Sequence, residues 1–384
     1  MKIITSNINS WLIALFVSLT CVASMISSFI SIPYISALLS LLMLFVSIYV
    51  NAVKVSPNKF YVYVILLIIL FVSNILYDAE LLSSYLLYYV TFATTSLVLS
   101  STSYDATKIL NNLSYIYILY LLIFLFRIQY SLIESDDYGS DQMGLAYSFV
   151  PPVLISSAYF IFKPSCDRSR KLTIINILLL VGSLYIILFM TVTRGAILSL
   201  LIGLFILFYY KANKVQRLVI SIVSILIIIL IFLFLDYFLK IFLDFSENSG
   251  IGALAKLAAF ADDGDVSNGR NSLYAAAITL FKQHPLLGYG IGYYEQIYKA
   301  YVHNIGLQLL CEGGIIGTIL FLLPIFRIRF LKNYRDINLG VLHIVLLSYT
   351  LILLMFSSTH WLTPTFWLMY FMLMSNGNAI NTIS

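Results

Sequence analysis

The feature that most limits the fold of this chain is a succession of apolar windows, each long enough to cross a membrane. A helix needs roughly 17 to 25 mostly apolar residues to cross the ~30 Å hydrocarbon layer. Twelve windows near this length can be laid along the chain, at about 9–30, 35–53, 60–77, 81–101, 109–129, 145–162, 172–192, 195–210, 217–239, 304–326, 339–357 and 361–375. With 61% hydrophobic and 10% charged residues, 384 residues carry more apolar surface than a soluble core can bury. The sequence predicts an all-α polytopic membrane protein of about 12 transmembrane helices.

We find no internal repeat and no detachable soluble segment, so we expect one transmembrane domain over residues 1–384 with a large outer loop at about 240–303. The first hydrophobic run, Trp11–Ile30, is longer than the core of a signal peptide and is interpreted as a retained helix. Cys21, Cys166 and Cys311 are scattered and have neither metal-ligand spacing nor an obvious disulfide partner. They are expected to be packing residues.

The orientation follows from the distribution of charge between the two sides of the membrane. Threading the windows from a cytoplasmic N-terminus puts 15 of the 22 basic residues and 3 of the 17 acidic residues on one side. The other side receives the remaining 7 basic and 14 acidic residues. Short loops rich in Lys and Arg stay in the cytoplasm, so the basic side is predicted to be cytoplasmic, together with both termini.

Two outer segments are much longer than the other connections. One is the acidic stretch Glu134–Asp141, and the other covers about 60 residues from Lys240 to Val302. Loops of this length are usually functional. The second contains an amphipathic piece, LAKLAAFADD, that is expected at the membrane surface. A helix over about Asn271–Gln283, a break at Pro285 and a glycine-rich turn follow.

The segment His303–Gly317, HNIGLQLLCEGGIIG, combines a histidine, a glutamate and closely spaced glycines at the start of a predicted membrane helix. Ionisable groups are expensive inside a membrane and often mark a functional site. Glu312 follows His303 by nine residues, which in a straight helix places it on the opposite face and about 13 Å deeper. We therefore expect Glu312 to be structural, and Gly313 and Gly317 to form a small-xxx-small packing pair.

Several cations are predicted to lie at the outer face with His303. Arg194 is expected at the turn between the seventh and eighth windows, Arg127 near the outer end of the fifth, and Arg270 and Lys282 in the large loop. Arginine suits phosphate groups because its planar guanidinium donates paired hydrogen bonds and keeps its charge. An interfacial arginine can also be a snorkelling anchor, and that alternative stays open for Arg127.

Histidine has an unperturbed pKa near neutrality, so His303 is the candidate base for a sugar hydroxyl. His360 is its rival at the outer face. Three tyrosines of the loop, Tyr289, Tyr294 and Tyr301, are candidates for stacking on sugar rings or, alternatively, for an interfacial aromatic belt. The run Gly288–Gly292 is a weak nucleotide-binding signal and is interpreted as a flexible hinge. We predict neither a metal site nor a cofactor.

Three stretches resemble the O-antigen polymerase and O-antigen ligase superfamily (Wzy and WaaL). They are TRGA at Thr193–Ala196, the arginine-containing stretch that ends in PLLGYGIG at Gly269–Gly292, and the histidine element at His303–Gly317. The likeness covers roughly the C-terminal half, and Tyr274 stands where relatives often carry tryptophan. The resemblance implies a GT-C-like membrane glycosyltransferase. It also implies that Arg194 and Arg270 bind the diphosphate of an undecaprenyl-linked oligosaccharide and that His303 activates the acceptor hydroxyl.

Our first hypothesis is therefore a repeat-unit polymerase of O-antigen or capsular polysaccharide, acting at the periplasmic face of the bacterial inner membrane without a metal. A ligase that passes the glycan to lipid A core is the alternative within the same class. A transporter or flippase of the lipid-linked glycan is the alternative from another class. The expected partners are the undecaprenyl-diphosphate-linked oligosaccharide and membrane lipids, with a chain-length regulator as a further candidate and no nucleic acid.

Overall fold

Helices account for the regular structure of the part of the chain that the computed structural model describes, which is residues 2–27, 29–30, 32–77, 80–129, 144–191, 193–233, 270–326 and 336–374. The helices are α1 (Lys2–Val17), α2 (Leu19–Ser27), α3 (Ile35–Val50), α4 (Pro57–Leu76), α5 (Glu80–Tyr88), α6 (Thr94–Leu99), α7 (Ala106–Gln129), α9 (Val150–Phe162), α10 (Arg170–Tyr185), α11 (Arg194–Lys211), α12 (Lys214–Leu233), α15 (Arg270–Gln283), α16 (Tyr293–Tyr298), α17 (Ile305–Phe326), α18 (Ile337–Phe356) and α19 (Pro364–Leu373). These ranges contain no strand, so the predicted all-α class is confirmed.

Each of the twelve predicted windows coincides with helix in the described residues. Within the described ranges, seven helices are long and apolar enough to cross a membrane, and an eighth span is obtained if α1 and α2, which meet at 70°, form one span. The windows of α3, α11 and α19 are occupied by shorter apolar helices. The chain is thus a multi-pass membrane protein, while the count of twelve spans stays a prediction. The acidic stretch 134–141 and the amphipathic piece LAKLAAFADD lie outside the described residues.

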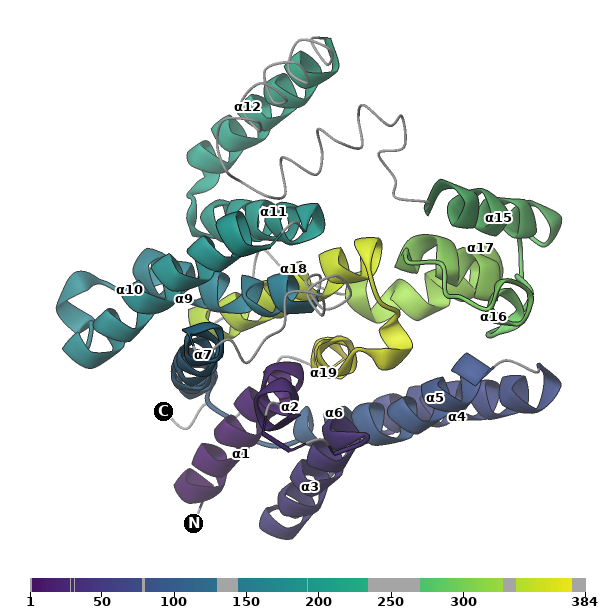
Figure 1. Ribbon diagram of the computed structural model, residues 1–384, viewed down its shortest axis with the longest axis horizontal. Coiled ribbons are helices and arrows are strands. Elements are labelled where there is room, and N and C mark those ends of the chain that lie inside the picture. Colours follow the sequence, from purple (N-terminus) through teal and green to yellow (C-terminus); the bar gives the residue numbers. More distant parts are fainter. Residues whose placement is uncertain are drawn as a thin grey trace. The chain divides into compact units, whose positions relative to one another are not determined.

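The chain divides into two units, one made of Met1–Ile116 with Gly269–Ser384 and the other of Tyr117–Asn268. In the first unit α4 runs beside α5, and α15 and α16 pack on α17 (Figure 1). Large aromatic side chains fill the space around α5 and α19. Tyr85, Tyr89, Trp361 and Trp367 are almost completely buried, and the rings of Tyr89 and Trp367 meet edge to face with their centroids 4.8 Å apart.

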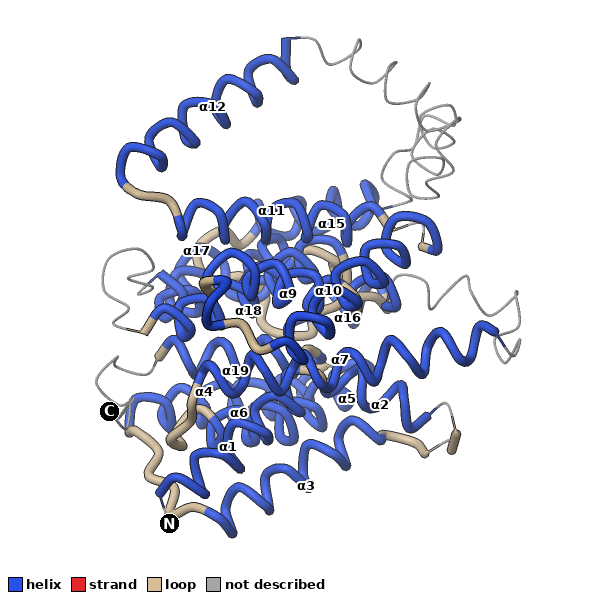
Figure 2. Tube along the Cα trace, turned by 90° about the vertical axis from the view of Figure 1, so that its left-hand side faces the viewer, coloured by secondary structure: helices blue, strands red, loops and turns tan. Residues whose placement is uncertain are grey.

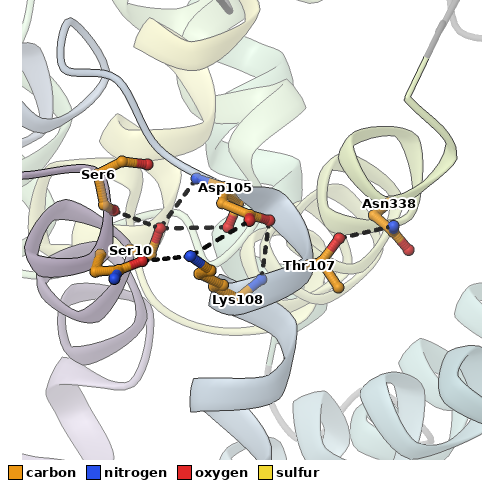
Figure 3. A network of polar contacts seen from close by, with 7 residues as sticks. Ser6, Ser10, Asp105, Thr107, Lys108 and Asn338 are labelled. Atoms are coloured by element: carbon orange, nitrogen blue, oxygen red, sulfur yellow. Dashed lines mark hydrogen bonds and ion pairs between the residues drawn. The ribbon is translucent and has the colours of Figure 1, made fainter. Parts of the chain in front are cut away.

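Polar side chains of α1 and of the starts of α7 and α18 join three segments that the charge distribution predicts on the cytoplasmic side (Figure 3). The Ser10 hydroxyl accepts a hydrogen bond from the Asp105 amide at 3.0 Å, and Lys108 lies 3.9 Å from the Asp105 carboxylate. Asn338 donates to the Thr107 hydroxyl at 2.9 Å. Segments expected on one side of the membrane therefore meet within the first unit, although the orientation itself stays a prediction.

In the second unit α9 packs against both α10 and α11. The helix that begins with α10 ends in a π-turn, Ile186–Met190, and the chain leaves helical geometry before α11 starts at Arg194. A short connection at 212–213 leads from α11 to α12 (Figure 2). The break that was predicted between the seventh and eighth windows is thus present at the position of the TRGA stretch.

Candidate functional site

The centre of the candidate site is a break in α17. Gly314 has φ 58° and ψ −161°, a backbone conformation that is essentially restricted to glycine. Such a break leaves carbonyl and amide groups of the helix without their usual partners, which is costly at membrane depth. The PLLGYG segment, in the loop predicted to lie outside, supplies those partners.

Four backbone hydrogen bonds join this inserted segment, residues 285–290, to the break. The amides of Tyr289 and Gly290 donate to the carbonyls of Cys311 and Glu312, at 2.8 and 2.9 Å. In the other direction, the amides of Ile315 and Ile316 donate to the carbonyls of residues 285 and 286, at 2.8 and 3.1 Å. The loop that follows α15 is therefore fastened to the interior of α17.

Glycine is required on both sides of this contact. A Cβ added at Gly288 would lie 2.6 Å from the Cys311 carbonyl oxygen, and one at Gly314 would lie 2.4 Å from the backbone of Leu286. Gly288 also has φ +66°. Gly288 and Gly314 are thus packed against a neighbouring backbone, while the interpretation of Gly288–Gly292 as a flexible hinge stays a prediction. The two motifs contain glycine because their backbones touch.

The predicted small-xxx-small pair is corrected at this point. A Cβ at Gly317 meets no described atom within 4 Å, and one at Gly313 meets only the amide of Thr318, at 3.5 Å. The close approach in this helix is made by Gly314 instead. The four-residue spacing of Gly313 and Gly317 is typical of packing between two straight helices. The segment that packs on α17 here is the irregular loop 285–290.

The predicted helix over Asn271–Gln283 is confirmed as α15, which lies along α17. An apolar cluster of Ala277 from α15, Cys311 from α17, Leu280, Tyr294 and Val302 is buried here. Tyr294 is 2% exposed and its hydroxyl donates to the Leu273 carbonyl at 3.1 Å. It is a core residue, so the prediction that Tyr294 stacks on a sugar is wrong in this structure.

His303 lies two residues before the start of α17 and has an unusual backbone, with φ +58°. Left-handed geometry at a residue other than glycine costs of order 1–3 kcal/mol and is found most often at functional sites. The half-buried imidazole packs on the ring of Tyr301, with centroids 4.2 Å apart. Its Nδ1 atom is buried and has no hydrogen-bond partner among the described residues.

Arg270, the first residue of α15, lies close enough to His303 for its charge to act on the imidazole. Burial lowers the pKa of His303, and the positive charge of Arg270 lowers that pKa further. Both effects favour the neutral imidazole, which is the form that accepts a proton. For Tyr301, burial raises the pKa of the phenol and Arg270 opposes the rise. The structure thus brings together Arg270, Tyr301 and His303 from the predicted set.

A buried polar chain that the sequence did not predict runs beside this group. Glu295, on α16, is 1% exposed, and its Oε1 accepts a hydrogen bond from the Tyr85 hydroxyl at 3.1 Å. The Gln308 amide donates to Glu295 at 3.4 Å and to Glu312 at 2.9 Å. Burial raises the pKa of the Glu295 carboxyl. In the sequence, Glu295 is a single acidic residue among the tyrosines of YYEQIY. Hydropathy does not distinguish such a buried acid from a solvent-exposed one.

The remaining loop tyrosines stack on one another. The rings of Tyr289 and Tyr293 are nearly parallel, 6° apart in plane with centroids at 4.3 Å, and the edge of His284 contacts Tyr289. Tyr77 donates a hydrogen bond to the Tyr289 carbonyl at 2.8 Å. One face of the Tyr289 ring is therefore covered by protein. A sugar could contact only the part of the ring that Tyr293 and His284 leave uncovered.

Two predicted cations lie in the second unit. Arg194 begins α11, and Arg127 lies in the last turn of α7, where a positive charge suits the helix C-terminus. Their convergence with His303 stays a prediction.

The other two candidates lie in the first unit. Lys282 is exposed in the last turn of α15. His360 is 0% exposed, so it contacts no solvent. Within the described ranges no group of three or more His, Cys, Asp or Glu side chains could hold a metal ion.

Comparison with known protein families gives a match over residues 177–322 to the family Wzy_C, O-antigen ligase. The matched range contains all three stretches that carry the resemblance, from Thr193 to Gly317. The match confirms the resemblance to the superfamily of O-antigen ligases and polymerases. A search of curated proteins found no match.

Proposed function

We propose that this chain, whose residues 177–322 match the O-antigen ligase family, is a repeat-unit polymerase of a bacterial surface polysaccharide. It transfers a growing glycan from undecaprenyl diphosphate to a sugar hydroxyl of the next lipid-linked unit, at the outer face of the inner membrane. The observation that carries the proposal is the left-handed backbone of His303, which lies two residues before the broken helix α17 and close enough to Arg270 for that charge to lower the pKa of the imidazole.

In the proposed reaction, His303 removes the proton of the acceptor hydroxyl as its oxygen attacks the anomeric carbon of the donor. The bond between that carbon and the diphosphate oxygen breaks, and the diphosphate leaves with the bonding electrons. Arg270, joined in the proposal by Arg194, stabilises the negative charge that develops on the leaving group. The imidazolium then returns its proton to solvent or to the diphosphate.

Neutral histidine and a neighbouring arginine suit this pair of tasks. A cation beside the imidazole would hinder a histidine that had to stay protonated, but it favours one that must start as a base. The same cation is correctly charged for a diphosphate. Lys282 and Arg127 are proposed to contribute positive charge around the anionic diphosphate of the donor, and Tyr289 and Tyr301 to contact its sugars.

The test is a reconstitution of the purified protein in liposomes with a labelled, undecaprenyl-diphosphate-linked repeat unit, with and without lipid A core. A ladder of carrier-linked oligomers, abolished in His303→Ala, is the expected result. Transfer of label to lipid A core without lengthening would assign the chain to ligation instead. Movement of unmodified units across the bilayer, unaffected by His303→Ala, would identify a flippase and contradict glycosyl transfer.

A further inference from the structure

The segment that carries His303 is held at both ends by one buried side-chain contact. Glu295 precedes this segment and Gln308 follows it, and the Gln308 amide donates to Glu295 Oε1 although the two residues are 13 positions apart in sequence. The same carboxyl oxygen is tied to the Tyr85 hydroxyl of α5. Gln308 in turn is anchored to Glu312 one turn further along α17. We call Tyr85, Glu295 and Gln308 the clamp.

The segment between the ends of the clamp contains two residues in left-handed geometry, Lys299 with φ +54° and His303 with φ +58°. Neither has the freedom of glycine, so both conformations persist only where the surroundings over-determine them. Val302 between them is fully buried and supplies apolar packing. The clamp adds hydrogen bonds at the two ends of the segment, at Glu295 and at Gln308.

The backbone conformation at residue 303 has more influence on the position of the imidazole ring than it has in many catalytic histidines. A base is commonly oriented by a carboxylate or carbonyl that hydrogen-bonds its second ring nitrogen. The Nδ1 atom of His303 is buried and receives no such bond from the described residues. Among the described residues, the ring position therefore depends on the backbone at residue 303 and on the Tyr301 ring, whose centroid lies 4.2 Å from that of the imidazole.

We propose that Glu295 is a positioning residue of the reaction, and that its hydrogen bonds to Tyr85 and Gln308 hold the backbone of His303 in the strained geometry that catalysis needs. The proposal rests on the proposed function. Glu295 touches neither substrate nor the reacting atoms in this scheme. Its carboxyl acts as a buried acceptor, and burial raises the pKa of this carboxyl.

The experiment compares Glu295→Ala, Glu295→Gln and Glu80→Gln in the reconstituted full-length protein. Glutamine keeps an oxygen that can accept from Tyr85 and Gln308, whereas alanine removes it. Glu80 is exposed in the first turn of α5 and is the matched control. We expect kcat per folded enzyme to fall about 10- to 100-fold in Glu295→Ala with little change in KM, because small misplacements of a catalytic group have costs of this size. Glu295→Gln should retain most of the wild-type kcat.

A second readout is independent of turnover. The rate at which diethyl pyrocarbonate modifies His303, measured by mass spectrometry, should rise in Glu295→Ala and stay at the wild-type value in Glu295→Gln and Glu80→Gln. If Glu295→Ala does not fold, Tyr85→Phe removes one hydrogen bond of the clamp and is expected to change kcat and labelling in the same direction by less.

The proposal would be overturned if Glu295→Ala kept the wild-type kcat and the wild-type rate of His303 modification. Equal loss in Glu295→Ala and Glu295→Gln would also overturn it, since the acid itself would then be required. A fall only in the amount of folded protein, with kcat per folded enzyme unchanged, would show a purely structural role. Full activity of His303→Ala would instead contradict the proposed function, and the labelling rates would still test the clamp.

Discussion

At the scale of single residues, the charge state of His303 is the property on which the proposed chemistry depends most. The imidazole is half-buried and close to Arg270, and both surroundings disfavour its protonated form. A histidine whose pKa is depressed in the folded protein stays a base to lower pH than a free histidine does. Activity that needs the neutral form is then present above the depressed pKa and is lost as the pH falls through it.

Replacing Arg270 should therefore move the acidic limb of the pH profile. In Arg270→Gln the pKa of His303 rises, because one of its two depressing causes is gone, and activity is lost at a higher pH than in the wild type. The rate itself should fall about 100-fold or more through loss of charge stabilisation of the leaving diphosphate. The measurement is kcat/KM against pH.

Arg270→Lys is the matched variant, because it keeps the charge but loses the paired hydrogen bonds. It should be slower than the wild type with its acidic limb in place. An unchanged limb in Arg270→Gln would contradict an electrostatic effect of Arg270 on His303.

At the scale of elements, the fastening of the PLLGYG segment into α17 connects two stretches of the sequence that otherwise look unrelated. The hydrogen bonds to Cys311, Glu312, Ile315 and Ile316 satisfy the groups that the break at Gly314 exposes. Neither the broken helix nor the irregular segment would be stable in an apolar surrounding without the other. The contact also fixes the distance from α15, with Arg270, to the outer half of α17.

Gly314→Ala is predicted to destroy this fastening. Alanine is strained at φ 58° and ψ −161°, by about 1–3 kcal/mol, and its Cβ would overlap the backbone of Leu286, which cannot rotate away. We expect a marked loss of thermal stability in detergent, read from the unfolding temperature. Gly317→Ala is the control, because a Cβ there meets no described atom within 4 Å and alanine favours helix. Equal stability of the two variants would contradict the observed contact.

At the scale of the whole molecule, the distribution of charge predicts the orientation in the membrane, and contacts within the first unit group the segments in the same way as that prediction does. Segments predicted on the cytoplasmic side meet around Asp105, and segments predicted outside meet around Glu295 and the inserted loop. The polar chemistry of the first unit is thus divided between two ends, of which the end with His303 holds the candidate site.

Cys166 gives a direct test of this orientation. It is the exposed cysteine of the three, whereas Cys21 and Cys311 are buried. It lies in the KPSCDRSRK run, which is predicted to be cytoplasmic. A membrane-impermeant maleimide should leave Cys166 unlabelled in intact spheroplasts and label it in inverted vesicles. A cysteine introduced as Gln283→Cys, at an exposed site in the outer loop, should give the opposite pattern, and a reversed result would invert the topology.

The sequence by itself determined the helical class, the positions of the apolar windows, α15 and the three motif stretches. Hydropathy and breaker residues act locally, and each helix satisfies its backbone within a single window, so these features need no knowledge of the partner segments. The place of His303 before a helix and the break before Arg194 followed from the same local reasoning.

Only the tertiary structure decided which motifs touch. The left-handed backbone of His303, the burial of Tyr294, the role of Gly314 in place of Gly317 and the clamp through Glu295 all depend on contacts between segments far apart in the chain. Spacing along one helix cannot reveal them, because the helix is broken and its partner is an irregular loop. An acid among tyrosines has the same hydropathy whether it faces water or, like Glu295, receives hydrogen bonds in the interior.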